Sequence, residues 1–439
     1  MSGFLRYRCM VVGAGPAGLF AAIRIAERLQ AVQKPSERDV LVLERCPKPA
    51  RKLLITGSGQ CNITRSGEIA DFLGHYGGGA KPESAARFLR PALLGFTNEA
   101  LLAWFQAKGI EFETEEGGKI FPKSRQASSI LDTLLAEAAQ RGITIETGRR
   151  VIGIERQEDC FTLRVEAGAE TEGLEAFEAS SLLIATGGAS YPATGSDGDG
   201  YVLAASLGHR IVAPRPALTP LFIKNFALGG LAGLSFHGAG LTIRRAGERT
   251  IEREGDLLIT HQGFSGPLIL DASRFVAAGD TVEIRFLDCG IEEFKDKLDE
   301  ALKANPQRLV RTILAEIGPA KSMAERFCQL AGIAEEDKAA DLARPKREAL
   351  CRLACAQPFE VEKLGSFAAA MVTAGGVDIS EVNAKTMESR IVPGLYFAGE
   401  VLDLDGDTGG YNLQAAFSTG DLAATAIAAR SILLEPPQD

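Results

Sequence analysis

The sequence predicts an α/β protein whose Rossmann-like dinucleotide domain is discontinuous in the chain and carries an inserted antiparallel β domain and a helical subdomain. Three observations predict this fold. The N-terminal segment combines a buried strand, a glycine turn, a helix and a second strand that ends in an acid. The middle of the chain changes to short alternating strands. Its last part returns to glycine-capped apolar strands.

Composition limits the classes of protein to consider. The 439 residues suggest two or three domains, and 46% apolar residues suffice for a substantial core. A net charge of −9 argues against electrostatic capture of nucleic acid or anionic lipid. The eight Cys are scattered, and the nearest pair, Cys351 and Cys355, lies four apart on an expected helix. We therefore expect reduced thiols in a cytoplasm, with no dithiol centre and no membrane span.

The apolar pattern places the elements of the dinucleotide domain in order. A period of two indicates strands, and a period near 3.6 indicates helices. The expected strands are 7–12, 40–44, 143–147, 150–155, 161–166 and 181–188. The expected helices are 19–29, 83–108, 126–141 and 411–431.

The inserted part is expected to have two portions. Alternating strands at 241–245, 256–261 and 281–287 predict an antiparallel sheet or small barrel, and residues 291–356 are rich in helix formers. The predicted domains are the dinucleotide domain 1–214 with 365–439, the β domain 215–290 and the helical subdomain 291–364.

The glycine turn after the first strand predicts a phosphate site. Gly13 makes the tight turn, Gly15 lets the backbone approach a pyrophosphate, and Gly18 allows close contact between helix and strand. The N-terminus of the helix offers free N–H groups to the phosphate. Glu44 is expected to accept hydrogen bonds from both hydroxyls of an adenosine ribose. The alternative is a βαβ turn that binds nothing.

Two further glycine-rich strand ends favour FAD over NAD. They are Ala185-Thr-Gly-Gly188 and Ala398-Gly-Glu400, and three such ends would converge on one extended ligand. Arg45 suits the adenine end, because a guanidinium can stack on the base or bond to it.

The loop 405–412 opens the last helix, so its amides are expected to face the flavin O2 and N1 edge and stabilise negative charge there. Glu400 is expected to bind ribityl or phosphate-proximal groups. The alternatives are an ordinary helix cap for the loop glycines and a solvated strand-end acid for Glu400.

Three residues are candidates for catalysis. Lys52 is expected to bond flavin N5 or O4 or to bind an anionic substrate, unless it makes a phosphate or surface contact. His261 could act as a general acid or base, although a structural histidine at a strand end is the commoner case. Tyr411 could cover the flavin or line a substrate pocket, with plain packing as the alternative.

Cys61 and Asn62 are expected near the isoalloxazine if the loop 56–62 wraps it. Since no resolving Cys lies in reach, Cys61 is expected to be a small packing residue rather than a redox thiol. His and Cys do not cluster at ligand spacing, so no metal site is predicted.

Five segments together resemble the BaiN/RdsA-type flavoproteins, NAD(P)/FAD-dependent oxidoreductases with two dinucleotide-binding domains. The segments are Gly13–Gly18, Arg51–Asn62, Ala185–Gly188, Thr260–Pro267 and Ala398–Gln414. The resemblance spans nearly the whole chain in order. It implies a non-covalent FAD, a glutathione-reductase-type FAD domain and an inserted β domain with helices. Relatives include an aminoacetone oxidase and reductases of unsaturated, steroid-like bile acid intermediates, so the family does not fix a substrate.

The fingerprint and this resemblance together define the candidate cofactor-binding residues. They are Gly13, Ala14, Gly15, Pro16, Ala17, Gly18, Glu44, Arg45, Lys52, Gly59, Gln60, Cys61, Asn62, Val151, Ala185, Thr186, Gly187, Gly399, Glu400, Gly409, Gly410, Tyr411, Asn412 and Leu413. Ala50 departs from the family pattern, which has glycine there. No second strand-linked Gly-x-Gly-x-x-Gly occurs, so NAD(P)H is expected only as a transient electron donor.

The expected function is hydride transfer between flavin N5 and a small organic substrate, in a cleft between the FAD domain and the inserted β domain. The direction of electron flow stays open. Nucleic acid and membrane are not expected as partners. The alternatives are a flavin-binding component of RNA modification and a flavin sensor without turnover.

Overall fold

The structure is a computed structural model, and it describes residues 6–32, 36, 38–79, 83–166, 174–244 and 250–434. The chain divides into two compact units. Unit 1 consists of Met1–Pro216 and Met371–Asp439, and unit 2 is the single stretch Ala217–Ala370. Unit 2 is thus an insertion in the chain of unit 1, with ends close to the breaks at 214/215 and 364/365 that the sequence predicts.

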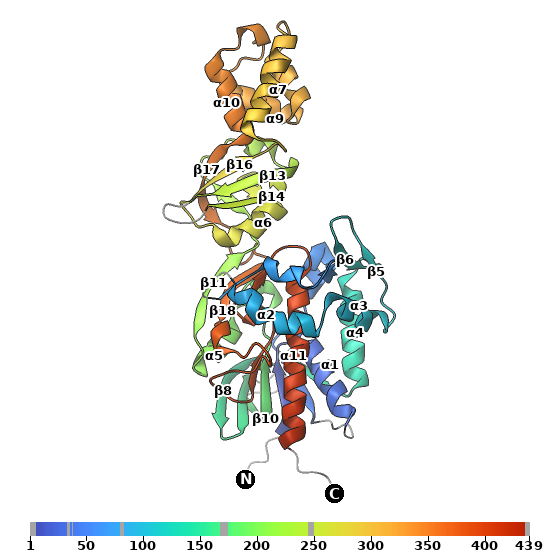
Figure 1. The fold of residues 1–439 in the computed structure, drawn as a ribbon. Helices are drawn as coiled ribbons and strands as arrows, with labels where there is room; N and C mark the ends of the chain where they lie inside the picture. The colour runs from blue at the N-terminus through green and yellow to red at the C-terminus, as the bar shows by residue number, and fades with distance from the viewer. Residues whose placement is uncertain are drawn as a thin grey trace. The chain divides into compact units, whose positions relative to one another are not determined.

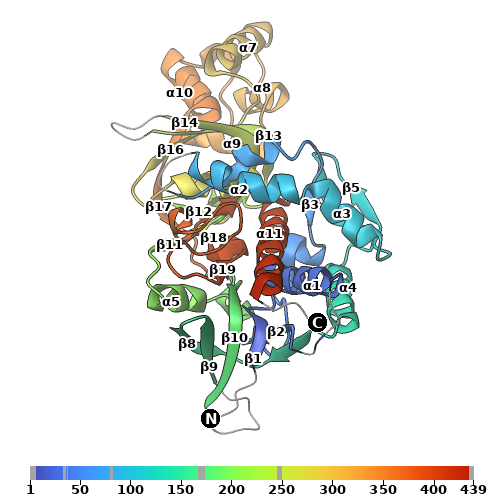
Figure 2. The same cartoon turned by 60° about the horizontal axis from the view of Figure 1, so that its bottom comes forward.

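Unit 1 is built on a seven-stranded mixed sheet (Figure 2). In spatial order its strands are β7 (Thr144–Thr147), β2 (Val40–Glu44), β1 (Arg6–Val12), β10 (Leu174–Ile184), β9 (Cys160–Glu166) and β8 (Val151–Gln157), with β19 (Leu395–Phe397) also paired to β10. The strands β7, β2, β1, β10 and β19 pair in parallel, whereas β8, β9 and the first part of β10 are antiparallel. All of the strands expected for this domain are present. The one expected at 181–188 begins at Leu174 and ends at Ile184.

The register of the parallel strands brings their carboxyl ends level. Val12 lies opposite Leu43 on one side and Ile184 on the other, and Ile184 lies opposite Phe397. Ligands of open α/β sheets bind outside the carboxyl ends of the strands, so this edge is where a cofactor is expected.

The helices of unit 1 are α1 (Pro16–Gln30), α2 (Ser84–Gly95), α3 (Asn98–Gln106), α4 (Ala127–Gln140), α5 (Asp199–Ser206) and α11 (Tyr411–Leu434). The sequence predicts one helix over 83–108, and this prediction is wrong at its centre. Phe96 leaves the helical conformation, and the hydroxyl of Thr97 accepts a hydrogen bond from Ala100 N at 3.2 Å. Thr97 is therefore an N-cap that starts a new helix.

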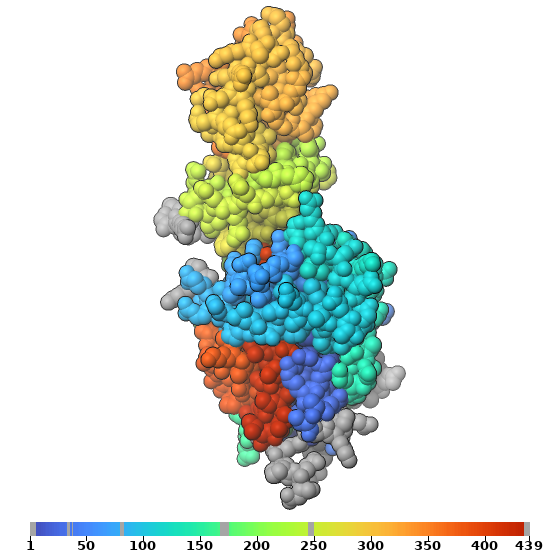
Figure 3. Space-filling view, turned by 45° about the vertical axis from the view of Figure 1, so that its right-hand side comes forward, coloured from blue at the N-terminus to red at the C-terminus, as the bar shows by residue number. Residues whose placement is uncertain are grey.

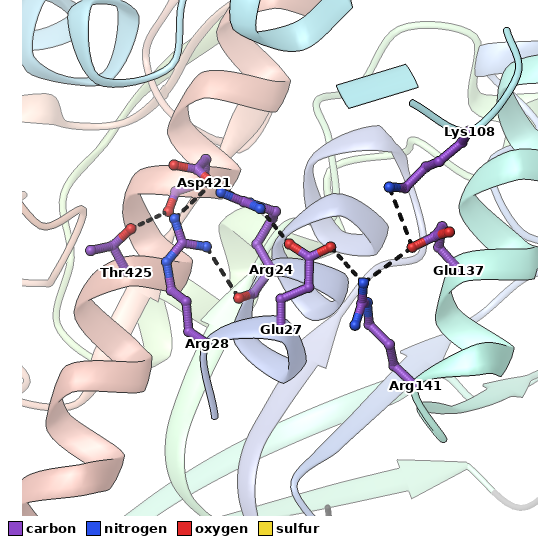
Figure 4. A network of polar contacts seen from close by, with 8 residues as sticks. All are labelled: Arg24, Glu27, Arg28, Lys108, Glu137, Arg141, Asp421 and Thr425. Atoms are coloured by element: carbon purple, nitrogen blue, oxygen red, sulfur yellow. Dashed lines mark hydrogen bonds and ion pairs between the residues drawn. The ribbon is translucent and has the colours of Figure 1, made fainter. Parts of the chain in front are cut away.

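The first and last helices of unit 1 pack against each other (Figures 1 and 3), and in Figure 3 the red surface of α11 borders the blue surface of α1. Arg24 Nε lies 2.6 Å and Arg28 Nη2 2.9 Å from Oδ1 of Asp421 (Figure 4). Glu27 continues the network to Arg141, which directly follows α4, at 2.8 Å. These ion pairs join three helices that are far apart in the sequence.

Smaller elements complete unit 1. Its short sheets are β3 (Thr64–Arg65) with β6 (Lys119–Pro122) and β5 (Phe112–Thr114), β4 (Tyr76–Gly77) with β20 (Asp405–Gly406), and β11 (Ile211–Ala217) with β18 (Val372–Val377). Its 3₁₀ helices are η1 (Leu53–Gly59), η2 (Asp71–His75), η3 (Pro192–Thr194), η7 (Ile379–Glu381) and η8 (Gly399–Val401).

Unit 2 contains a closed barrel and helices that lie in the chain between its strands. The barrel order is β12 (Leu221–Ile223), β15 (Gly263–Ser265), β14 (Ile251–Ile259), β13 (Ser235–Ile243), β16 (Thr281–Arg285) and β17 (Gln357–Leu364). The helices are α6 (Pro267–Ala272), α7 (Ile291–Ala304), α8 (Val310–Ile317), α9 (Lys321–Leu330) and α10 (Arg344–Cys355), with η4 (Gly229–Leu231), η5 (Ser273–Phe275) and η6 (Ala339–Asp341).

The strand β17 corrects the predicted helical subdomain 291–364, because it pairs with β12 and β16 and closes the barrel. Phe359 and Val361 alternate into the same apolar core that receives Phe294 and Phe327 from the helices. Barrel and helices therefore share one core.

No helix among the described residues is both long enough and apolar enough to cross a bilayer.

Candidate functional site

The turn after β1 requires glycine at two of its positions. Gly13 has φ +104°, and a Cβ placed there would lie 2.6 Å from the carbonyl oxygen of Ala185. A Cβ on Gly18 would lie 2.0 Å from the carbonyl oxygen of Gly13. These two glycines hold β1, the end of β10 and α1 at backbone contact distance.

The N-terminus of α1 is open. A Cβ on Gly15 would meet nothing within 4 Å, although Gly15 itself has an ordinary extended conformation. Gly15 is the N-cap and supplies no capping side chain, Pro16 follows, and the first turn contains no acid. No side chain among the described residues caps the first N–H groups of α1, so these residues fit the pyrophosphate of a dinucleotide.

Glu44 ties the end of β2 to the glycine turn. Its Oε2 accepts a hydrogen bond from Ala14 N at 2.9 Å, and its Oε1 accepts one from Cys46 N at 2.8 Å. Its backbone carbonyl accepts from Arg149 N at 2.8 Å, which brings the start of β8, and hence Val151, toward β2. Each carboxylate oxygen can accept a second hydrogen bond, so the expected ribose contact remains compatible with this arrangement.

Arg45 is engaged by carboxylates. It pairs with Asp197 and, at 2.8 Å, with Asp199, and Arg150 also binds Asp199 through two nitrogens at 2.9 Å. Burial opposes ionisation of Asp199, but the hydrogen bond from Arg150 and the charge of Arg45 outweigh it and lower the pKa of this carboxyl. An adenine contact would use the faces of this paired guanidinium.

The three glycine-rich strand ends lie together, as the sequence predicts. Ala185 N donates to Val12 O at 2.9 Å, and Ala398 N donates to Ile184 O at 3.2 Å. Gly399 has φ +74°, and a Cβ there would lie 2.9 Å from Cβ of Ala17. Thr186 and Gly187 continue directly from the same end of β10.

Lys52 lies in a polar network that also contains Glu400. Lys52 Nζ lies 2.7 and 3.0 Å from the two carboxylate oxygens of Glu400 and 3.0 Å from the hydroxyl of Ser190. Glu400 Oε1 also accepts from Thr373 N at 2.9 Å and from the Ser190 hydroxyl at 2.9 Å. The charge of Lys52 is thus balanced by Glu400, and neither side chain is a free ion. No pattern in the sequence indicates Ser190 or Thr373.

The loop from Ala50 to Asn62 contains several left-handed residues. Ala50, where the resemblance leads us to expect glycine, has φ +49°, and Cys61 has φ +61°. Asn62 Nδ2 donates to the carbonyls of Thr64 and Ile120 at 2.8 and 3.0 Å. In the same loop Gln60 accepts from Arg125 at 3.1 Å, and Gly59 has φ +87°. Hydrogen bonds of the Asn62 and Gln60 side chains therefore help to hold this loop.

The thiol of Cys61 is expected to be unreactive in the folded protein. It is fully buried, and burial raises the pKa of this thiol to about 12. We expect maleimide at pH 8 to label Cys61 only after unfolding, with the partly exposed Cys160 and Cys289 labelled first. Mass spectrometry of the labelled peptides measures this, with protein unfolded in guanidinium as the control. Rapid labelling of Cys61 in native protein would contradict its assignment as a packing residue.

The loop before α11 packs closely on β3. Gly409 and Gly410 have φ of +110° and +101°, and a Cβ on Gly410 would lie 2.5 Å from the carbonyl of Thr64. The side chain of Asn412 makes two hydrogen bonds to the backbone of Gly406. Its Oδ1 accepts from Gly406 N at 2.8 Å, and its Nδ2 donates to the carbonyl of Gly406 at 2.9 Å. Leu413 is partly buried against the core.

The three catalytic candidates lie in different settings. Lys52 belongs to the network with Glu400. Tyr411 is 3% exposed and packs against the rings of Phe72 and His75, so its ring has the packing role left open by the sequence. His261 is exposed in the turn between β14 and β15 of unit 2. His261 thus belongs to unit 2, whereas Lys52 and Tyr411 belong to unit 1.

Among the described residues, no group of three or more His, Cys, Asp or Glu could hold a metal ion.

Comparison with known proteins gives a consistent result. A family model described as HI0933-like protein Rossmann domain matches residues 7–426. A 3-dehydro-bile acid delta(4,6)-reductase of Clostridium scindens is 33% identical over 433 residues, covering 96% of this chain and 99% of that protein. A ribosomal RNA dihydrouridine synthase of Escherichia coli is 32% identical over 431 residues, covering 97% of this chain and 99% of that protein.

A solved structure shares the fold along the chain. It is the 3-ketosteroid-delta4-(5alpha)-dehydrogenase from Rhodococcus jostii RHA1 in complex with 4-androstene-3,17-dione, with a TM-score of 0.50 and 16% identity, covering 98% of both chains. At this identity the likeness concerns the fold alone.

Proposed function

The chain belongs to the HI0933-like Rossmann-domain family and is an FAD-dependent oxidoreductase, and from this premise we propose that it reduces a carbon–carbon double bond conjugated to a carbonyl group in a small organic substrate. The observation that carries the cofactor part of the proposal is the meeting of three glycine-rich strand ends around the open N-terminus of α1. This arrangement suits one extended dinucleotide.

The chemistry in the names of two relatives supports the substrate class. A delta(4,6)-reductase of a 3-dehydro bile acid acts on double bonds conjugated to a ketone. A dihydrouridine synthase saturates the C5=C6 bond of uracil, which is conjugated to the C4 carbonyl. The feature common to both substrates is an acceptor carbon β to a carbonyl, the position that hydride attacks. We extend this shared chemistry to the present chain.

The residues of unit 1 divide the binding of FAD among them. The amides around Gly15 bind the pyrophosphate, and Glu44 binds the ribose. The amides of the loop ending at Gly410 bind the pyrimidine edge of the flavin. Lys52 and Glu400 bind the part of FAD that lies between the pyrophosphate and the flavin ring. When bound, FAD supplies the hydride from its N5. We propose that NAD(P)H only docks transiently to reduce the flavin.

The test is a single-turnover reaction. Purified protein should be yellow and release FAD on heating. After anaerobic photoreduction, it is mixed with a 3-oxo-4,6-diene steroid or with cyclohexenone, and the flavin absorbance bands are followed. We expect reoxidation together with an equal amount of product in which one C=C bond is reduced, which is a steroid ketone with one remaining C=C bond from the diene and cyclohexanone from cyclohexenone. Reoxidation by O2 alone, with every enone inert, would refute the proposed reaction.

Ribosomal RNA is a second candidate substrate, because ribosomal RNA dihydrouridine synthases of Escherichia coli and Haemophilus influenzae align with this chain over 97% and 95% of its length. The net charge of −9 argues against it. Photoreduced protein is incubated with unmodified ribosomal RNA, and nucleosides are analysed by mass spectrometry. Formation of dihydrouridine with inert enones would assign the RNA activity instead.

A further inference from the structure

His75 and Asp407 form a pair beside the loop that opens α11. Nδ1 of His75 lies 2.9 Å from Oδ2 of Asp407, although the residues are 332 positions apart in the chain. The backbone fixes the pair as well, because Asp407 N donates to the carbonyl of His75 at 2.9 Å. The strands β4 and β20, which adjoin the two residues, pair with each other. The imidazole is therefore held in one orientation.

The ring of His75 is stacked on Tyr411, with centroids 4.3 Å apart and planes inclined by 14°. Tyr411 is fixed in turn, since its carbonyl accepts a hydrogen bond from the hydroxyl of Tyr76 at 2.8 Å. The guanidinium of Arg65 lies 5.9 Å from the centre of the Tyr411 ring. His75 thus lies directly beside the start of α11, where we propose that the pyrimidine edge of the flavin binds.

The side chain of His75 is more exposed to solvent than the residues that hold it. The side chain of His75 is 43% exposed, whereas that of Asp407 is 7% exposed and Tyr411 as a whole is 3% exposed. Among the described residues, Nε2 of His75 has no hydrogen-bond partner, because the contacts of the ring are those with Asp407 and Tyr411. A buried carboxylate on one ring nitrogen and an available second nitrogen is the arrangement of acid–base histidines.

We propose that His75 is the catalytic acid of the reduction and that Asp407 is its positioning residue. The inference rests on the proposed function. The hydride adds to the β carbon with its electron pair, the π electrons of the C=C bond move toward the α carbon and the carbonyl, and Nε2 of protonated His75 gives its proton to the α carbon. The substrate gains a hydride and a proton, the cofactor is oxidised by two electrons, and His75 regains its proton from water.

Two variants of His75 separate catalysis from structure. Asn at position 75 offers Nδ2 to Asp407 in place of Nδ1 and removes the second nitrogen, whereas Gln removes the contact with Asp407. We expect both His75→Asn and His75→Gln to slow flavin reoxidation by the enone by about 10²–10⁴-fold. Reduction by dithionite and reoxidation by O2 should change by less than about twofold, and FAD content should be unchanged. An unchanged enone rate in His75→Asn, which keeps the contact, would overturn the proposal.

The chain offers a matched control in unit 2. Nδ1 of His237 lies 2.9 Å from Oδ1 of Asp256, and the His237 side chain is 87% exposed. His237→Asn changes the same kind of pair outside the candidate site, so all rates should stay at the wild-type value. An equal loss of enone reduction in His237→Asn would count against a specific role for His75.

A second readout does not depend on flavin turnover. Oxidised protein is incubated in D2O with a saturated 3-ketosteroid or with 5,6-dihydrouridine, and loss of the α-hydrogen signal is followed by NMR. Wild-type protein should accelerate exchange of the α hydrogens, and His75→Asn should not. If no enone is reduced, the proposed function fails and this exchange still decides the role of His75. If wild-type protein does not accelerate this exchange, the proposed role of His75 as catalytic acid is overturned.

Discussion

Replacing Gly18 with alanine is expected to abolish FAD binding and to destabilise unit 1 by roughly 2–3 kcal/mol. The added methyl would lie 2.0 Å from the carbonyl oxygen of Gly13 and 3.2 Å from a methyl of Val11. Both belong to buried backbone or core, so α1 must move away from β1 and the phosphate site is lost with it. FAD content after purification and the free energy of unfolding in urea measure the two effects.

Gly15→Ala is the matched control within the same fingerprint. Its methyl would meet no atom within 4 Å, and the backbone there is extended, so the stability of the apoprotein should stay within about 0.5 kcal/mol of wild type. FAD affinity should nevertheless fall, because the methyl occupies the space through which the pyrophosphate approaches. Normal FAD affinity in Gly15→Ala would show that the phosphate lies elsewhere.

Glu44→Ala is expected to reduce both stability and cofactor affinity. The change leaves the N–H groups of Ala14 and Cys46, both in buried residues, without their acceptor, which costs about 2–4 kcal/mol of folding free energy. Loss of the charge-assisted bonds to the ribose weakens FAD binding by on the order of 1–3 kcal/mol. Urea unfolding of the apoprotein and FAD titration separate the two contributions.

Glu44→Gln distinguishes the roles of shape and charge. The amide keeps one acceptor oxygen and turns two donors toward the other N–H, so an intermediate loss of stability is expected.

Unchanged FAD affinity in Glu44→Ala would show that the ribose is bound by other residues, even if stability falls as expected.

The fold of unit 1 follows from local signals in the sequence. The strand, glycine turn, helix and acid from Tyr7 to Glu44 are contiguous, and Gly13 and Gly18 are each required by a close backbone contact. By contrast, β17 falls within the predicted helical subdomain because it follows α10 directly. Its strand partners, β12 and β16, lie earlier in the chain, and nothing local indicates closure of a barrel.

The candidate site shows the same division. Gly13 and Gly399 can be identified from the sequence because they follow apolar strands, and Gly18 can be identified because it completes the Gly-x-Gly-x-x-Gly spacing. Ser190 cannot, since its role depends on Glu400, which is 210 positions away. The same reason applies to His75. A lone histidine at the end of a short 3₁₀ helix carries no signal until the fold brings a carboxylate to it.

The pairing of α1 with α11 determines when this protein can finish folding on the ribosome. A nascent chain that has reached the end of β19 holds every strand of the main sheet, but Arg24 and Arg28 still lack Asp421, and the side of α1 that packs against α11 is uncovered. The inserted barrel is one uninterrupted stretch with its own core and emerges before that point. Translation therefore delivers the insertion complete while the domain that surrounds it in the sequence still waits for its last helix.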